Sequence, residues 1–325
     1  MKTILRRCSI FILVFSLFLF NGCTRNVDLN RVEKKKTITL IAKMKSGDYW
    51  NTIKMGADAA AREFGVNVEF AAPQDEQDIE EQKRLMNLAI EQKVGAIVLA
   101  AGDFTALVEV TERAYDQHLP VIMIDSEVNT QKYHSYISTD NVEAGKKAGE
   151  KLVEIAGGNC RVAIMNFVQG SRNAQEREAG VLQVLSLHPQ IQVVAKEYCH
   201  SDTRLAVNLT RKIIEEKGPV DVIVALNSFA AVGVSQVVDE MNLENKVKVV
   251  AFDSIAEEID FLDKDVIQAT IVQNPFNIGY LGIKHAVEAM QGKKIPKRVD
   301  TGIKIIDKNN MYLPENQKLL FPFIK

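Results

Sequence analysis

The stretch Thr37–Gly65, TITLIAKMKSGDYWNTIKMGADAAAREFG, decides the fold of this chain. It opens with a short, mostly apolar run, Ile38 to Ala42, that is typical of a buried strand. A polar loop, Lys43–Asp48, follows, and an amphipathic helix then runs to Gly65, a residue type that commonly ends helices. Strand, loop and helix in this order form the first unit of a parallel α/β sheet. Because ligands bind beyond the carboxyl ends of the strands in such sheets, we expect a functional site at this loop and the two aromatic residues behind it.

The two halves of the chain resemble each other. VGAIVLAAGDFTAL from Val94 is similar to VDVIVALNSFAAVG from Val220, and VIMIDSE from Val121 is similar to VVAFDSI from Val249. The offsets between the matched segments, 126 and 128 residues, are nearly constant. Most apolar runs are continuous rather than alternating, which favours strands covered on both faces. The repeat predicts an α/β fold of two similar Rossmann-like lobes with parallel sheets.

The last third of the chain can only complete these two lobes, so the chain has to cross between them three times. We place the crossings near Asp140, Gln273 and Thr301, where they form a three-strand hinge beside a cleft. The predicted N-terminal lobe comprises residues 37–139 and 274–302, and the C-terminal lobe comprises residues 140–273 and 303–325. We also expect a helix over residues 102–117 and one strand over Thr301–Ile306.

The N-terminus has the pattern of a targeting segment. Basic residues precede Ile10–Phe20, an apolar run of signal-peptide length that is too short to span a membrane. Gly22 before Cys23 looks like a bacterial lipobox, in which the cysteine is lipidated. We predict a signal peptide over residues 1–22 and a lipid-anchored tether over 23–36; the alternative is an ordinary secretory peptide with an incidental cysteine. The lipid on Cys23 would anchor the protein outside the cytoplasm, at the bacterial cell membrane.

Composition and motifs exclude several classes of function. The formal net charge is −2, which gives no basic character for nucleic acid. The histidines show no metal-ligand spacing, and neither a nucleophile–base set nor a phosphate-binding glycine loop is visible, so we expect no enzyme, no cofactor and no metal. Cys160 and Cys199 lie at opposite ends of neighbouring predicted strands, too far apart to bond, and we expect two free, buried thiols.

Polar residues at the predicted strand ends are the candidate ligand contacts. Asp125 and Asp253 occupy equivalent strand ends, where carboxylates could accept hydrogen bonds from ligand hydroxyls; the alternative is a place beside a helix cap, since Ser254 and Glu257 have capping-box spacing. Asn227 could read a hydroxyl or cap the following helix.

The other candidates have equally ordinary alternatives. Tyr49 and Trp50 could stack on a sugar ring or belong to the core, and Gln273 could contact the ligand or serve only the hinge. Arg177 lies between two glutamates on a predicted helix, and by position alone a solvated charge is the better interpretation.

The chain resembles the periplasmic sugar-binding proteins of the ribose/galactose/xylose group, which supply ABC importers and are related to the cores of sugar-responsive repressors. The resemblance covers about Thr37 to Lys308. It rests on the aromatic pair after the first strand and on PVIMIDS, STDNVEAG, GSRNAQEREAG, VIVALNSFAAVGV, VVAFDS and ATIVQNPFNIG, in this order and spacing. It implies a type I periplasmic binding protein fold and ligand contacts from Asp48, Tyr49, Trp50, Asp125, Arg177, Asn227, Asp253 and Gln273.

The resemblance also implies a mechanism in which the lobes close on a sugar and the closed face docks on a membrane partner. This sequence has Ser126 where the ribose type has arginine, and Ser46-Gly47-Asp48 where that type has Asn-Asn-Pro. These departures predict a different monosaccharide or a polyol. The expected partner is the permease of an ABC importer; the alternative is a membrane histidine kinase. A repressor core is excluded because a signal peptide replaces the helix-turn-helix.

Overall fold

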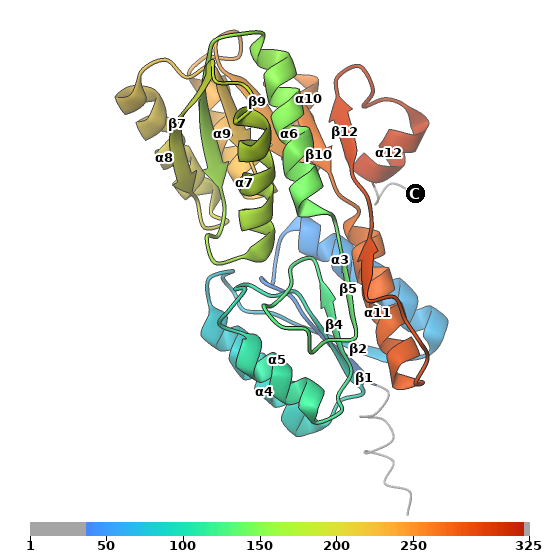
Figure 1. The fold of residues 1–325 in the computed structure, drawn as a ribbon. Coiled ribbons are helices and arrows are strands. Elements are labelled where there is room, and N and C mark those ends of the chain that lie inside the picture. Colours follow the sequence, from blue (N-terminus) through green and yellow to red (C-terminus); the bar gives the residue numbers. More distant parts are fainter. Residues whose placement is uncertain (1–36, 322–325) are drawn as a thin grey trace, which may run out of the picture. The chain divides into compact units, whose positions relative to one another are not determined.

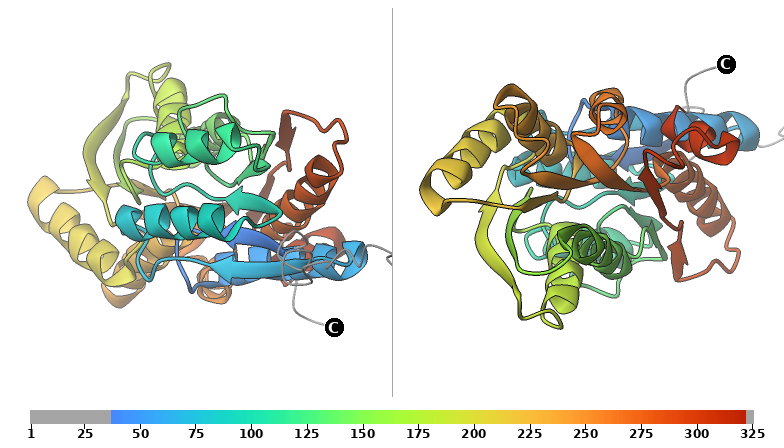
Figure 2. Two further views of the ribbon diagram at one scale, coloured as in Figure 1. Left: turned by 90° about the horizontal axis from the view of Figure 1, so that it is seen from below. Right: turned by 90° about the horizontal axis from the view of Figure 1, so that it is seen from above.

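The structure is a computed structural model that describes residues 37–321 (Figure 1). The predicted signal peptide, Cys23 and the tether lie outside the described residues. Within the described part, two sheets of six strands each carry helices on both faces, as the views of Figure 2 show. This is the predicted α/β fold with two similar lobes.

The sheet of the N-terminal lobe is parallel throughout and has the strand order β11-β5-β4-β3-β1-β2. Its strands are β1 (Thr37–Ile41), β2 (Asn67–Ala71), β3 (Ala96–Leu99), β4 (Val121–Ile124), β5 (Ser135–Ser138) and β11 (Arg298–Asp300). Its helices are α3 (Asp48–Phe64), α4 (Ile79–Gln92), α5 (Val108–Asp116) and α11 (Pro275–Met290). Alternate residues of the central strands enter two different cores: Leu40 packs in the core of α3 and α11, while Ile41 packs in the core of α4 and α5. The continuous apolar runs therefore have the predicted cause, burial on both faces.

The sheet of the C-terminal lobe has the order β12-β10-β9-β8-β6-β7 and is parallel except for β12, which is antiparallel to β10. Its strands are β6 (Cys160–Asn166), β7 (Ile191–Tyr198), β8 (Val222–Ala225), β9 (Lys248–Phe252), β10 (Ile267–Val272) and β12 (Lys304–Asp307). Its helices are α6 (Asn141–Ala156), α7 (Arg172–Leu185), α8 (Thr203–Lys217), α9 (Ser228–Glu240), α10 (Ala256–Asp263) and α12 (Pro314–Leu320). Cys160 and Cys199 are both buried with free thiols, as predicted.

Three segments connect the lobes, between β5 and α6, between β10 and α11, and between β11 and β12. The single strand expected over Thr301–Ile306 is wrong, because this segment is a crossing: β11 ends at Asp300 in one sheet and β12 begins at Lys304 in the other. Gly302 turns the chain between them with φ of 74°, a conformation that glycine adopts without strain.

Other element boundaries also differ from the prediction. Helix α3 already begins at Asp48, which was predicted to end the loop, so Tyr49 and Trp50 lie in its first turn. Helix α5 begins at Val108 instead of near residue 102, because the Asp103 carboxylate accepts hydrogen bonds from the backbone N–H groups of Thr105 and Ala106 and holds a turn there. The short helix α12 was not expected.

None of the helices between residues 37 and 321 is both long and apolar enough to cross a membrane.

Candidate functional site

Seven of the eight candidate residues line one cavity between the lobes, which we call the inter-lobe cavity. These seven are Tyr49, Trp50, Asp125, Arg177, Asn227, Asp253 and Gln273. Six further residues complete its wall: Lys43, Glu76, Phe167, Asn173, Ser228 and Phe229. The cavity volume is about 40 Å³. Asp48 is the exception: it is exposed and lines a neighbouring cavity instead.

Asp125 and Asp253 share an unusual backbone conformation directly after β4 and β9. Their φ angles are 59° and 77°, in the left-handed region that non-glycine residues rarely adopt. In each lobe a hydroxyl of the neighbouring strand donates to the aspartate carbonyl: Ser138 to Asp125 and Thr270 to Asp253, each at 2.6 Å. These contacts hold the strained residue in place and leave its side chain at the sheet edge.

The capping-box interpretation of the segment after Asp253 is wrong. Helix α10 begins at Ala256, and it is the Glu258 carboxylate that accepts a hydrogen bond, 2.9 Å from the N–H of Ile255. The cap therefore lies one residue beyond the predicted Ser254 and Glu257 pair, so Asp253 is free of the cap.

The Asp125 carboxylate is surrounded by donors of the protein. Tyr49 donates its hydroxyl to Oδ1 at 2.8 Å, while Lys43 Nζ and Asn173 Nδ2 approach Oδ2 at 3.0 and 3.3 Å. Lys43 and Tyr49 belong to the N-terminal lobe and Asn173 to the C-terminal lobe. This carboxylate is therefore part of a contact between the lobes.

Lys43 is the main site residue that sequence reasoning missed. Only 1% of its side chain is exposed, and its ammonium group donates to Ser171 Oγ at 2.9 Å and to Asn173 Oδ1 at 3.0 Å across the lobe boundary. Glu76 lies 3.5 Å away and accepts a hydrogen bond from Ser201 of the opposite lobe. The available signal was a lysine placed directly after a buried strand. A buried ammonium group needs charged and hydrogen-bonding partners, and Lys43 has both.

The Asp253 carboxylate has fewer protein partners. Gln273 Nε2 donates to Oδ1 at 2.7 Å, and the backbone N–H of Ser228 donates to Oδ2 at 3.1 Å. Ser228 is the first residue of α9, where the helix dipole favours a negative charge. Burial nevertheless raises the pKa of Asp253, although nearby Arg177 opposes the shift.

Arg177 is buried, with 2% exposed, so the interpretation as a solvated charge is wrong. Its guanidinium group lies near the rings of Phe252 and Phe167, with centroids at 4.7 and 5.6 Å. Nε donates to Asn141 Oδ1 at 2.9 Å, and Nη1 donates to the carbonyl of Leu226 at 2.7 Å. These two bonds fix the plane of the guanidinium group, and Arg177 lines the inter-lobe cavity.

The position of Arg177 depends on close packing of α6 against α7. A Cβ atom at Gly145 would lie 2.1 Å from the carbonyl oxygen of Arg177, closer than any side chain permits. Glycine therefore lets the two helices touch, and this contact places Arg177 beside Asn141 at the start of α6.

Asn227 and the aromatic pair have the ordinary structural roles considered for them and also line the inter-lobe cavity. Asn227 caps α9 by accepting a hydrogen bond from Ala230 N at 2.9 Å, and its amide also donates to Ser201 at 3.1 Å in the cavity wall. Trp50 belongs to the core yet lines the cavity, edge-on to Tyr49 with centroids 5.3 Å apart. The pKa of Tyr49 is raised well above its ordinary value by burial and by the Asp125 and Asp253 carboxylates, so Tyr49 stays a hydrogen-bond donor.

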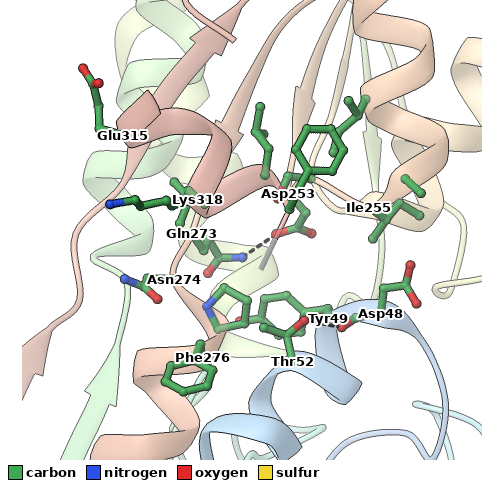
Figure 3. Close-up of a pocket in the computed structure, with 17 residues that line it drawn as sticks. Asp48, Tyr49, Thr52, Asp253, Ile255, Gln273, Asn274, Phe276, Glu315 and Lys318 are labelled. Carbon is green, nitrogen blue, oxygen red and sulfur yellow. Dashed lines mark hydrogen bonds between the residues drawn. The ribbon is translucent and has the colours of Figure 1, made fainter. Parts of the chain in front are cut away.

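A second, larger cavity opens beside the first, and we call it the lateral cavity (Figure 3). Its volume is about 560 Å³. Tyr49, Asp253 and Gln273 line both cavities, and Figure 3 shows the hydrogen bond from Gln273, directly after β10, to Asp253, directly after β9.

The inter-lobe cavity offers carboxylates, amides, a guanidinium group and aromatic faces at close range. Such groups bind neutral molecules that are rich in hydroxyls, since they supply both acceptors and donors beside surfaces for C–H groups. No cluster of side chains that could hold a metal ion occurs in the described part of the chain.

The chain is similar to known sugar-binding proteins. The ribose import binding protein of Haemophilus influenzae is 28% identical over 278 residues, which are 83% of this chain and 91% of that protein. A solute-binding protein of a carbohydrate transporter from Agrobacterium radiobacter, solved with D-arabinose, aligns with a TM-score of 0.85 at 30% identity, covering 87% of this chain and 98% of that one. GanP, a glucose-galactose binding protein from Geobacillus stearothermophilus, is 32% identical with a TM-score of 0.81, and 85% and 99% of the two chains are covered.

The sequence model of the periplasmic binding protein domain matches residues 38–294, most of the chain. This family binds substrates and is not catalytic, which agrees with the expected lack of an enzymatic site. The fold of two six-stranded sheets with flanking helices matches the type I fold of the solved relatives. The chain therefore belongs to the periplasmic binding protein family.

Proposed function

We propose that this protein captures a monosaccharide or a related polyol in the inter-lobe cavity and delivers it to the permease of an ABC importer. The single observation that carries the proposal is the convergence of Asp253, Arg177 and Asn227, all buried, on one cavity that also has an aromatic wall. The sugar ligands named for the relatives support the same class of ligand.

Ligand capture requires the lobes to move. At about 40 Å³ the inter-lobe cavity is far below the ~300 Å³ at which small-molecule pockets usually begin. A sugar ring therefore enters only when contacts such as that between Lys43 and Asn173 separate, and closure around the ring restores contacts from both lobes.

We also propose a role in ligand binding for each of the site residues. Asp253, Asn227 and Arg177 would bind ligand hydroxyls from the C-terminal lobe, Trp50 would pack on the ring, and Gln273 would contact it from the hinge. Tyr49 and Asp125 would complete the N-terminal side, and Asp48 at the lateral cavity would contribute least. The lobe boundaries given in the sequence analysis stay a prediction.

Binding is tested by titrating the mature domain with pentoses, hexoses, inositol and furanosyl signals. The readouts are Trp50 fluorescence, calorimetry and the melting temperature. We expect at least one sugar or polyol to bind and to raise the melting temperature, because a ligand that binds only the folded state stabilises it. If no compound of the panel binds, the proposed function is wrong.

We further propose that lipid on Cys23 anchors the protein outside the cytoplasm, where it can meet the permease. Replacement of Cys23 by serine should abolish labelling by radioactive fatty acid and release the protein from the membrane fraction. Membrane retention of the Cys23→Ser protein would contradict this anchor. The alternative of signalling to a membrane histidine kinase stays a prediction.

A further inference from the structure

The lateral cavity has the size and lining of a ligand site, and the proposed capture of a simple sugar leaves it unused. Its volume of about 560 Å³ falls within the range of small-molecule pockets. It lies between the first turn of α3, the β9–α10 loop, the hinge segment after β10 and helix α12.

The lining of the lateral cavity is mainly apolar. Aliphatic and aromatic side chains from three of these four segments, all except α3, form most of it: Ile255, Ile259, Pro275, Phe276, Leu319 and Phe321. Charged groups occur in the same lining at Asp48, Glu315 and Lys318 (Figure 3). Such a lining suits a ring or an alkyl group, whereas free hydroxyl groups would gain little from it.

The two cavities are adjacent across three residues. Tyr49, Asp253 and Gln273 line both, so any ligand that Asp253 binds in the inter-lobe cavity lies next to the lateral cavity. The carboxylate of Asp253 and the amide of Gln273 are joined by the hydrogen bond of 2.7 Å. A substituent that extends past these two side chains would reach the apolar wall directly.

We propose that the ligand is a glycoside, in which the sugar ring binds in the inter-lobe cavity and an apolar or ring-bearing substituent fills the lateral cavity. This inference rests on the proposed sugar-binding function and narrows it. The sugar ring supplies the hydroxyls for Asp253, and the substituent buries apolar surface against Phe276 and Ile255.

The test compares free sugars with their glycosides on the mature chain. D-xylose, D-glucose and D-galactose are titrated beside their phenyl β-D-glycosides by calorimetry. We expect at least one phenyl glycoside to bind about tenfold tighter than the free sugar, since the ring leaves water for an apolar surface.

Two substitutions test whether the gain in affinity for the glycoside arises in the lateral cavity. Ala256→Trp fills the lateral cavity from an exposed position, and Phe276→Ala removes one wall; neither residue lines the inter-lobe cavity. Both should reduce glycoside binding to the level of the free sugar and leave free-sugar binding unchanged. Glu257→Trp, at the adjacent exposed position outside both cavities, is the matched control and should change neither.

The outcomes separate this inference from the proposed function. If free sugars bind but no glycoside binds more tightly, or if Ala256→Trp weakens both ligands equally, the glycoside inference is overturned and sugar binding stands. If neither free sugars nor glycosides bind, the proposed function fails as well. If glycosides gain affinity only after deletion of residues 322–325, the cavity serves the chain's own C-terminal residues, which also overturns the inference.

Discussion

Asp125 in the N-terminal lobe and Asp253 in the C-terminal lobe occupy the ends of equivalent strands, with the same left-handed backbone and the same hydroxyl contact to the carbonyl. Their carboxylates nevertheless have different surroundings. Among residues 37–321, Asp125 has three donors, and one of them, Asn173, comes from the opposite lobe. Asp253 has two, from the hinge at Gln273 and from the start of α9 in its own lobe.

The difference shows how two equivalent strand-end aspartates can serve different functions. The bonds of Asp125 and Lys43 connect the two lobes to each other, so they contribute to the closed arrangement even before a ligand contact is counted. The bonds of Asp253 orient a carboxylate while leaving it lone pairs for a ligand. We therefore expect substitutions on the Asp125 side to act on stability and closure, and those on the Asp253 side to act on ligand binding.

The largest effect is expected for Lys43→Met. The substitution leaves the buried Asp125 and Glu76 carboxylates without their cation, and breaking a buried ion pair from one side typically costs about 3–5 kcal/mol. The free energy of unfolding, measured with urea, should fall by that amount. Lys54→Met, which breaks the exposed pair with Asp58, is the matched control and should cost less than about 1 kcal/mol. Equal losses in both variants would contradict the structural role of Lys43.

Asp253→Ala should have the next largest effect, and on ligand affinity. Loss of a charge-assisted acceptor costs about 1.5–3 kcal/mol per hydrogen bond, so affinity for the bound sugar should fall about 100-fold. Calorimetry measures the affinity, and circular dichroism checks that the fold is intact. A folded Asp253→Ala protein with normal affinity would show that Asp253 does not contact the ligand.

The fold was largely predictable from the sequence because its signals are local. Each apolar run between turn residues predicts a buried strand. The equivalence of Asp125 and Asp253 can be read from the similar apolar segments that precede them. The predicted ends of helices and strands that were wrong depend on single local features. Examples are the turn that Asp103 holds before α5 and the turn at Gly302 where the chain crosses between the lobes. Helix α12 has seven residues, too few for a clear periodic pattern.

The site was only partly predictable because burial of a charged residue is decided by distant partners. The acceptors of Lys43 on the opposite lobe, Ser171 and Asn173, lie 128 and 130 residues further along the chain. Arg177 has charged neighbours in sequence, and its burial follows from the glycine contact between α6 and α7. Only the resemblance to a family indicated Arg177, and nothing in the sequence pattern indicated Glu76.

Asn173→Ala tests whether the contacts of Asp125 and Lys43 across the lobe boundary affect only the closure of the lobes. The variant loses the acceptor for Lys43 and the donor to Asp125, both across the lobe boundary. We expect every sugar that binds to lose about the same factor, roughly 3- to 10-fold, because a smaller closed population lowers all affinities alike. Gln175→Ala, an exposed residue of the same helix, should have no effect. A loss that differs between sugars would show that Asn173 contacts the ligand directly.

The smallest effect, and the finest test of the difference between the two aspartates, is the pH dependence of binding. Burial raises the pKa of Asp253 above its ordinary value, with Arg177 opposing the shift and Asp125 adding to it. A ligand hydroxyl needs the ionised carboxylate, so affinity should be constant at high pH and fall as the pH drops through this raised pKa. The loss should begin above about pH 4, the value for an unperturbed aspartate.

Titrations between about pH 4 and 7 measure this dependence on protein that remains folded. Asp253→Asn should bind weakly at every pH and lose the dependence. Glu258 is buried nearby, and burial together with Asp253 raises its pKa well above the ordinary value, so it is the competing source of a pH effect. Glu258→Gln should therefore keep the dependence of the unmodified protein. If the dependence disappears in Glu258→Gln and persists in Asp253→Asn, the titrating group is Glu258, and Asp253 resembles Asp125 more closely than its contacts indicate.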